Sequence, residues 1–464
     1  MALARPMRPA SPPVLGKILP VAVSLATLGY LVYGLTEGSP NLRFIQLGAV
    51  LGLLAYVATF VDIILGLSFL LACIGLSPEM TLGGLDNLRI EDFIIPGLLV
   101  AWLTRAAQRR EPWIPTGLGG PCAAYFLTLV AASLLGIAAG TTTFRAALLI
   151  LIKYVEYFLI FAIVVHNVRT EGEFRALVIF AALVALTSLT MGTTGEIAGT
   201  GVARVHGPAG ETATIYGGYL LLTISVLLGL AIDGPAGPSR LLALGAAAPL
   251  AWGLLFTYSR TSYAALFLGV LAFSVLKARR LLPLLVLLLV MFPALAPGSV
   301  WERAQTIAGV VSGSSPASWD SRVHAWYAAL TRMGPEHFLL GRGVGSTPLG
   351  ELDNEYIRVL VDAGLLGLGF FLWILVRLGR AAGAAHGALP PRTFARGYAA
   401  GFLIGLFAML VHAVGATSFT SIRTMESLMF WTGLLIAVSH RRAEWGLTLP
   451  EPGRPSPPRP FPFR

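Results

Sequence analysis

The chain has 464 residues, of which 56% are hydrophobic and only 12% charged, whereas a soluble domain carries roughly 25% charged residues. This composition excludes an ordinary soluble protein and indicates an integral membrane protein. Apolar runs such as LLPLLVLLLVMFPALAP (281–297) are continuous and Leu-rich, which fits membrane helices and excludes the alternating strands of a transmembrane barrel. The formal charge of +10 comes from short basic clusters between apolar runs, so it indicates membrane topology and no nucleic-acid partner.

We therefore predict an all-α polytopic membrane bundle with about 12–14 transmembrane helices. Basic clusters recur at roughly every second connection, and the positive-inside rule places these connections and both termini in the cytoplasm. The first apolar run has no small-residue cleavage site after it, so we interpret it as a retained span. The apolar runs cover 14–35, 43–59, 61–77, 89–104, 121–139, 146–167, 174–191, 211–232, 240–257, 261–277, 281–297, 364–379, 396–417 and 424–440.

The runs divide the chain into four predicted regions. Residues 1–297 form an N-terminal transmembrane bundle, and residues 298–363 form one large outward loop that contains short helices. C-terminal transmembrane helices occupy 364–442, and a Pro-rich, disordered cytoplasmic tail occupies 443–464. A loop as long as 298–363 in a compact protein is usually functional, so we expect active-site elements there.

The long loop carries helical signals. The stretch SWDSRVHAWYAALTRM has apolar residues at three- and four-residue steps, which predicts an amphipathic helix capped by Ser318. The following GRGVGS favours irregular backbone. Asp353-Asn354 then offers a cap for a short helix that runs to Asp362 and ends at Gly364.

Three outward arginines are the main candidates for substrate binding. Arg204, Arg260 and Arg322 lie in three different connections on the face that the positive-inside rule leaves poor in cations. A guanidinium matches phosphate oxygens bidentately, so a lipid-linked diphosphate is a natural partner. The alternative for any one of them is snorkelling to lipid headgroups or pairing with a loop carboxylate.

Asp353 admits two interpretations. As a structural residue it caps the helix that follows, and as a chemical residue it is a carboxylate that takes a proton from an attacking hydroxyl. Asn354 can take the cap instead and leave Asp353 available. Glu351 and Glu355 are weaker candidates for the same base.

Other polar groups in the spans point to structure. Lys153 and Glu156 are three residues apart in one apolar run, which predicts an internal ion pair. Cys73 and Cys122 lie in or beside apolar segments and predict no disulfide framework. No His, Cys or carboxylate pattern has metal-ligand spacing and no nucleotide-binding motif is present, so we predict no metal and no cofactor.

In this combination of motifs the chain resembles the O-antigen ligase and O-antigen polymerase superfamily of bacterial envelope glycosyltransferases. The resemblance covers about residues 140 to 440. Its features are Arg204-Val-His-Gly before a span, Tyr258-Ser259-Arg260 opening the next but one, Ser321-Arg322 with Trp326 followed by Pro335 and GRGVGS, and Asn354 followed after nine residues by Gly364-Leu-Leu-Gly367.

The resemblance implies a metal-independent glycosyltransferase with its active site on the periplasmic face of the bacterial inner membrane. The donor is a glycan on undecaprenyl pyrophosphate, and a hydroxyl of a second glycan or lipid acceptor attacks it. Arg260 and Arg322 are implied to bind the diphosphate and stabilise the leaving group, with Arg204 as a third contact. The supporting residues are Asn354, Trp326, Glu355 and Tyr356. Membrane lipids and a chain-length regulator protein complete the implied partners.

One residue departs from the family pattern. Ligases of this family carry a His immediately before the Asn of the motif, and this chain has Asp353 there. The difference favours a polymerase that joins lipid-linked repeat units, with a ligase acting on lipid A-core or another acceptor as the alternative. A lipid-linked sugar transporter is a third possibility, which predicts polar groups spread through the spans.

Overall fold

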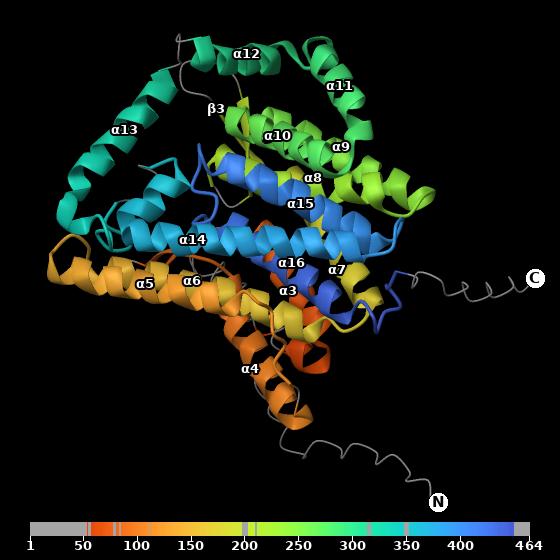
Figure 1. Cartoon of the computed structure of the whole chain (residues 1–464), viewed down its shortest axis with the longest axis horizontal. Helices are drawn as coiled ribbons and strands as arrows, with labels where there is room; N and C mark the ends of the chain where they lie inside the picture. The colour runs from red at the N-terminus through yellow and green to blue at the C-terminus, as the bar shows by residue number, and fades with distance from the viewer. Residues whose placement is uncertain are drawn as a thin grey trace, which may run out of the picture.

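The computed structural model describes residues 53, 57–77, 80–82, 85–110, 112–196, 203–208, 211–312, 317–347 and 352–449. This part of the chain is mainly helical, with two antiparallel two-stranded hairpins (Figure 1). The hairpins pair β1 (Met80–Leu82) with β2 (Leu85–Leu88) and β3 (Thr193–Glu196) with β4 (Ala203–His206). The predicted run 14–35, most of 43–59, Glu351 and tail residues 450–464 lie outside the described residues.

Every apolar run predicted from residue 61 onward is a helix. Eight helices of the described part are long and apolar enough to cross a membrane, which confirms the predicted all-α membrane architecture: α5 (Gly119–Ala138), α6 (Phe144–Asn167), α7 (Glu171–Met191), α8 (Ala213–Asp233), α9 (Pro238–Phe256), α10 (Arg260–Lys277), α14 (Glu355–Ala388) and α15 (Phe394–His412). The other predicted runs form α3 (Ile63–Leu76), α4 (Glu91–Arg109), α11 (Leu282–Leu295) and α16 (Ile422–Arg441).

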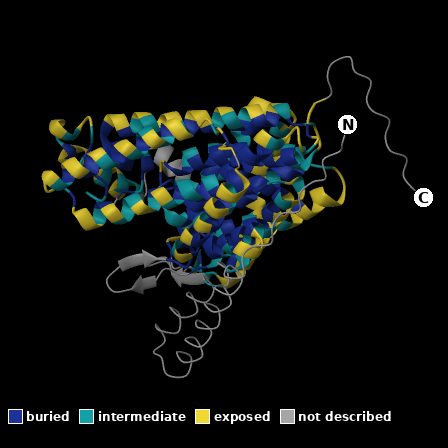
Figure 2. Cartoon of the chain, turned by 90° about the horizontal axis from the view of Figure 1, so that it is seen from below, coloured by how far each residue is buried: buried dark blue, intermediate teal, exposed yellow. Residues whose placement is uncertain are grey.

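The centre of the bundle is the closely packed pair α8 and α15, whose residues are mostly buried. Figure 2 shows the buried residues gathered in the interior of the molecule. Gly397 and Gly401 are one helical turn apart on α15, and Gly229 faces them from α8. A Cβ on Gly229 would lie 2.0 Å from the backbone nitrogen of Gly401. Small residues at such spacing let two membrane helices approach to backbone contact, because no side chains separate them. This close packing matters in lipid, where no hydrophobic driving force brings helices together.

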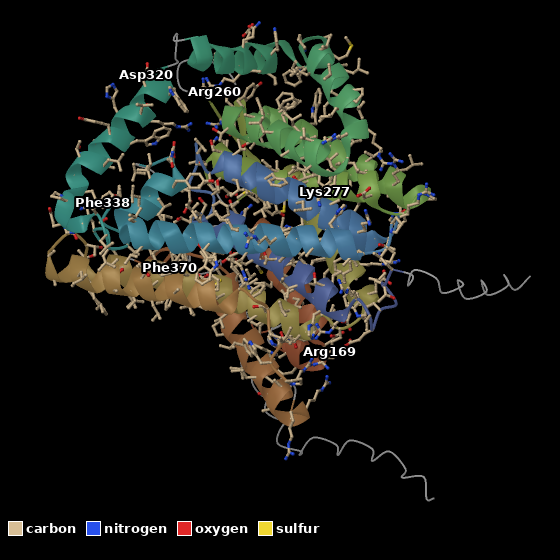
Figure 3. All side chains as sticks on the ribbon, viewed as in Figure 1. Arg169, Arg260, Lys277, Asp320, Phe338 and Phe370 are labelled. Atoms are coloured by element: carbon tan, nitrogen blue, oxygen red, sulfur yellow. The ribbon has the colours of Figure 1, made fainter. Side chains whose placement is uncertain are left out.

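The basic connections gather at one end of the bundle. Asp233, the last residue of α8, accepts from His386 Nε2 at 2.7 Å and lies 3.5 Å from Arg280 and 3.8 Å from Arg396. His386 and Arg396 flank the connection between α14 and α15, and Arg280 lies between α10 and α11. Lys277 marks this end in Figure 3, and Arg260 marks the opposite end. These basic groups therefore gather at the end of the bundle away from Arg260.

The long loop forms an arm at the other end. Helices α12 (Gly298–Ser312) and α13 (Ala317–Met333) leave the bundle after α11 and return to α14 (Figure 1). The amphipathic helix is confirmed, but it begins at Ala317, so Ser318 lies inside its first turn and the predicted cap is wrong. A 3-10 turn, η2 (Pro335–His337), follows α13.

The long helix α14 is broken at Gly364, where the backbone is non-helical (φ 68°, ψ −168°). The predicted short helix before this glycine is confirmed. The segment after η2 bonds to the broken turns: Arg342 N donates to Val361 O, Gly343 N to Asp362 O, and Leu365 N to Phe338 O. Backbone groups freed by a helix break need partners at membrane depth, and here the GRGVGS segment supplies them. We call this pairing of residues 338–343 with 361–366 the clasp.

Candidate functional site

Four arginines converge at the end of the bundle that carries the arm. They are Arg204 on β4, Arg260 on α10, Arg303 on α12 and Arg322 on α13, and we call them the arginine cluster. Each of the other three is close enough to repel the charge of Arg260. Like charges held together in a partly buried place are unfavourable unless an anion joins them, so the arrangement is suited to binding an anion.

Arg260 occupies the centre of this arrangement. It is the first residue of α10, a position set by Ser259, whose side chain caps the helix by accepting from Ser262 N. Its Nη1 donates to Thr306 Oγ1 on α12 at 2.8 Å, so the arm is bonded to the start of a span. The N-terminus of α10 adds the positive end of a helix dipole to the charge of Arg260.

Arg204 is braced by neutral oxygens. Its Nε donates to Thr257 O at 2.6 Å and its Nη2 to Thr214 Oγ1 at 3.3 Å, which fixes β4 against the turn before Arg260. Burial lowers the pKa of the Arg204 guanidinium from its usual value, and repulsion from Arg303 and Arg322 lowers it further. Arg204 thus both holds the turn in place and contributes charge to the cluster.

Arg303 is a member of the cluster that sequence reasoning missed. Its Nε is buried and has no hydrogen-bond partner in the described structure. An unpaired buried donor is costly, which suits a group that awaits an acceptor. The signal was present in the sequence: Arg303 is another arginine of the outward loop, but it matches no motif.

Arg322 and Asp353 form an ion pair. Arg322 Nη2 lies 3.0 Å and Nε 3.1 Å from the same carboxylate oxygen, Asp353 Oδ2. The Asp353 side chain is 40% exposed, so its carboxylate faces open space beside the arginine cluster. The pair brings together the two residues that the sequence proposed as diphosphate ligand and base.

The residue that caps α14 is Asn354 and not Asp353. Asn354 is the N-cap of α14, and its side chain accepts from Ile357 N at 3.1 Å. Asp353 lies before the cap, so the prediction that it caps the helix is wrong and its carboxylate remains available for chemistry. Asn354 acts as a support, because it sets where α14 begins and hence where Asp353 lies.

Two predicted supporting residues hold the scaffold. The Glu355 carboxylate is fully buried and accepts from Phe419 N at 3.0 Å, Thr420 N at 3.2 Å and Thr420 Oγ1 at 2.6 Å. It is committed to the connection between α15 and α16, so its candidacy as a base is wrong. Tyr356 donates its hydroxyl to Leu410 O at 2.8 Å and thereby ties α14 to α15.

Trp326 lies one helical turn after Arg322 on α13. Its ring packs edge-on against Trp319 at 5.4 Å between centroids, and it borders a small apolar cluster with Met333 and Leu352. The indole Nε1 is buried without a hydrogen-bond partner in the described structure. Trp326 therefore shapes the arm and offers a further unused donor.

The other sequence predictions concern groups away from the cluster. The internal pair is confirmed, with Lys153 Nζ 2.8 Å from Glu156 Oε2, and Asp92 on α4 is a second partner of Lys153. Cys73 and Cys122 are free thiols, as predicted.

The charges of the arginine cluster are suited to binding an anion. Guanidinium groups bind phosphate oxygens and neutralise charge on a leaving group, and Asp353 supplies a carboxylate at the edge of the same space. The comparison with protein families agrees: residues 245–372 match the family model described as O-Antigen ligase. This match confirms the resemblance to the O-antigen ligase and polymerase superfamily, and it includes Arg260, Arg303, Arg322 and Asp353. No curated protein sequence matches the chain.

Proposed function

With that family match as the premise, we propose that the protein is a glycosyltransferase of the bacterial inner membrane that polymerises oligosaccharide repeat units carried on undecaprenyl pyrophosphate. The observation that carries the proposal is the convergence of four arginines on one end of the bundle. The diphosphate of a lipid-linked donor is an anion suited to such a cluster. In this proposal the cluster faces the periplasm and the basic connections and both termini face the cytoplasm.

The arginines bind the donor and stabilise its departure. The acceptor hydroxyl oxygen forms a bond to the anomeric carbon while the bond from that carbon to the diphosphate oxygen breaks. Negative charge then develops on the polyprenyl diphosphate, where Arg260 and Arg303 neutralise it. Because the guanidinium groups supply this charge, the transfer itself needs no metal ion.

Asp353 is the proposed base, and Arg322 controls its availability. The acceptor hydroxyl loses its proton as it attacks, and the Asp353 carboxylate takes it. Without donor, Arg322 holds one oxygen of Asp353. A diphosphate competes for the Arg322 guanidinium, so donor binding loosens the ion pair and leaves the carboxylate a stronger hydrogen-bond acceptor at the moment it is needed.

The acceptor separates polymerase from ligase. The ligase alternative transfers the same glycan to lipid A-core or another hydroxyl, and it rests on the family description. Purified protein supplied with a lipid-linked repeat unit alone gives a product ladder if it is a polymerase. Unextended substrate, with transfer only after an acceptor such as lipid A-core is added, would overturn the polymerase assignment in favour of the ligase.

A transporter is the alternative from another class. It predicts movement of lipid-linked sugar across a bilayer without product formation, unaffected by Asp353→Asn or Arg260→Ala. Assays of both reactions in reconstituted vesicles separate the two classes, because each variant abolishes product only in an enzyme.

A further inference from the structure

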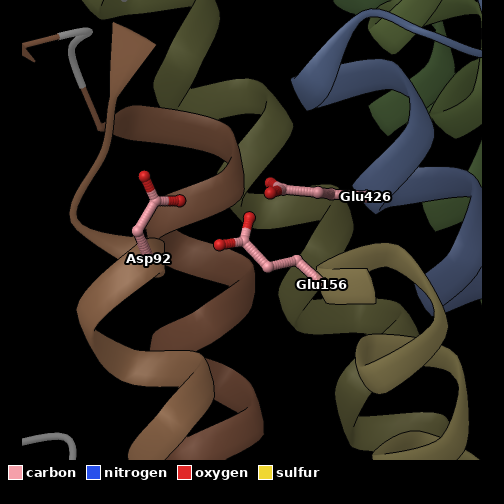
Figure 4. Close-up of side chains that lie close together, drawn as sticks. All are labelled: Asp92, Glu156 and Glu426. Atoms are coloured by element: carbon pink, nitrogen blue, oxygen red, sulfur yellow. The ribbon is translucent and has the colours of Figure 1, made fainter. Parts of the chain in front are cut away.

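A second group of charged residues lies apart from the arginine cluster. Asp92 on α4, Glu156 on α6 and Glu426 on α16 bring carboxylate oxygens to within 4.8 Å of one another (Figure 4). The three carboxylates come from helices far apart in the sequence and point toward a common centre. The charged groups that act most strongly on Glu426 are Glu91, Arg89, Lys153 and Asp92, and no member of the arginine cluster is among them.

Glu426 accepts no hydrogen bond from any residue that the structure describes. Its side chain is 0% exposed, and neither carboxylate oxygen has a hydrogen-bond partner in the described structure. Burying a carboxylate in this way costs several kcal/mol unless a cation or donors compensate it. The fold thus buries the Glu426 carboxylate where no described residue donates a hydrogen bond to it.

Lys153 compensates only part of the charge. Its ammonium bonds to Asp92 and lies 2.8 Å from Glu156 Oε2, but it makes no such contact with Glu426. When all three carboxyl groups are ionised, as ligands of a cation are, they outnumber the one ammonium by two charges. Nearby, Arg89 pairs with Glu91 and Arg423 pairs with Glu211.

We propose that Asp92, Glu156 and Glu426 bind one divalent, oxygen-preferring cation of the Ca²⁺ type. A Ca²⁺ ion sits about 2.3–2.6 Å from each ligand oxygen, so it spans oxygens up to roughly 5 Å apart, whereas Mg²⁺ at about 2.0–2.1 Å requires a tighter set. Two positive charges balance the two that Lys153 leaves. The ion would join α4, α6 and α16, so its role is to hold these helices together.

The site has a route for the ion. The side chains of Asp92 and Glu156 are 9% and 13% exposed, whereas Glu426 is enclosed behind them. Asp92 is the second residue of α4 and Glu426 lies in the second turn of α16. Asp92 and Glu426 thus lie near the starts of their helices, whereas Glu156 lies midway along α6, and the two partly exposed carboxylates leave a path to Glu426.

The test is a direct binding measurement on the full chain in phosphatidylcholine nanodiscs, after treatment with a chelator. Calorimetric titration with calcium chloride is expected to give one site per chain, and Ca²⁺ is expected to raise the thermal midpoint. Glu426→Gln keeps the side-chain shape and is expected to weaken Ca²⁺ binding by at least about tenfold. Glu444→Gln, which changes an exposed carboxylate after α16, is the matched control and is expected to bind as the unmodified chain does.

The outcomes are decisive in both directions. If Glu426→Gln does not fold, Glu156→Gln carries the same titration with a less buried ligand. Absence of saturable Ca²⁺ binding by the unmodified chain, or binding that these variants leave unchanged, overturns the proposal. A thermal midpoint that responds to pH but not to Ca²⁺ also overturns it, because the excess charge would then be neutralised by protons. None of these readouts depends on glycan transfer.

Discussion

Replacing Arg303 tests whether the arginine cluster binds the donor diphosphate. Arg303 is the member of the cluster that belongs to none of the sequence motifs of the family. Arg303→Ala removes one of four converging charges and a buried donor that has no hydrogen-bond partner in the described structure. Because the side chain contributes repulsion to the protein without substrate, its loss should not lower the thermal midpoint. Its contribution should be confined to the complex with the donor diphosphate.

The expected size follows from one charged hydrogen bond. A hydrogen bond to a charged partner contributes about 1.5–3 kcal/mol, which corresponds to roughly a 10- to 150-fold loss in kcat/KM for the lipid-linked donor. Arg303→Lys keeps the charge but not the planar fork, so it should recover only part of this loss. The assay is glycan transfer by protein in nanodiscs, with donor concentration varied and products separated by gel.

Arg332→Ala is the control, because Arg332 is an exposed arginine of the same arm at the end of α13. It should leave kcat/KM within about twofold, as surface substitutions usually do. If Arg303→Ala retains normal kcat/KM, the proposed contact between Arg303 and the diphosphate is wrong. A large drop in thermal midpoint with a parallel loss of activity would mean that Arg303 serves the fold instead.

Three further predictions concern the proposed reaction and its scaffold. Arg260→Ala and Arg322→Ala should each lower turnover by at least about 100-fold, which is the usual effect of removing one preorganised charge that stabilises a leaving group. Near-normal turnover by both variants would refute the proposed diphosphate site. Asp353→Asn should lower kcat by roughly 10²–10⁴-fold while donor affinity stays unchanged, and full activity would exclude it as the base. Gly364→Ala forces a Cβ to 2.3 Å from Leu339 O in a backbone region reserved for glycine, so it should lower the free energy of unfolding by at least about 3 kcal/mol and with it the thermal midpoint. Gly369→Ala on the same helix is the control, because its Cβ meets no atom within 4 Å and its midpoint should not change. Equal midpoints for the two variants would show that the break bears no strain.

The sequence predicts most of the helices because hydrophobicity alone decides them. A continuous apolar run must satisfy its backbone hydrogen bonds internally, so each run from residue 61 onward folds as a helix. The amphipathic helix of the arm and the break at Gly364 were also predictable, one from periodicity and one from the glycine. Ser318 was misplaced because a helix start can shift by one or two residues without changing the pattern.

The sequence predicts those site residues that depart from the positive-inside rule. Arg204, Arg260 and Arg322 stand out as outward cations, and the structure brings them together. Glu355 looked similar to Asp353 in sequence, yet one lies in the core and the other is 40% exposed. That difference depends on which way the first turn of α14 faces, which neither composition nor spacing specifies.

The clasp between residues 338–343 and 361–366 has a consequence for how the protein is made. The apolar stretch after Gly364 can enter the bilayer on its own, whereas the clasp forms only once residues 338–343 have folded back onto α14. Synthesis would thus deliver an inserted but incomplete molecule, in which Arg322 and Asp353 meet last. We expect variants that fail at this step to reach the membrane in normal amounts and to be cut by an external protease within the arm.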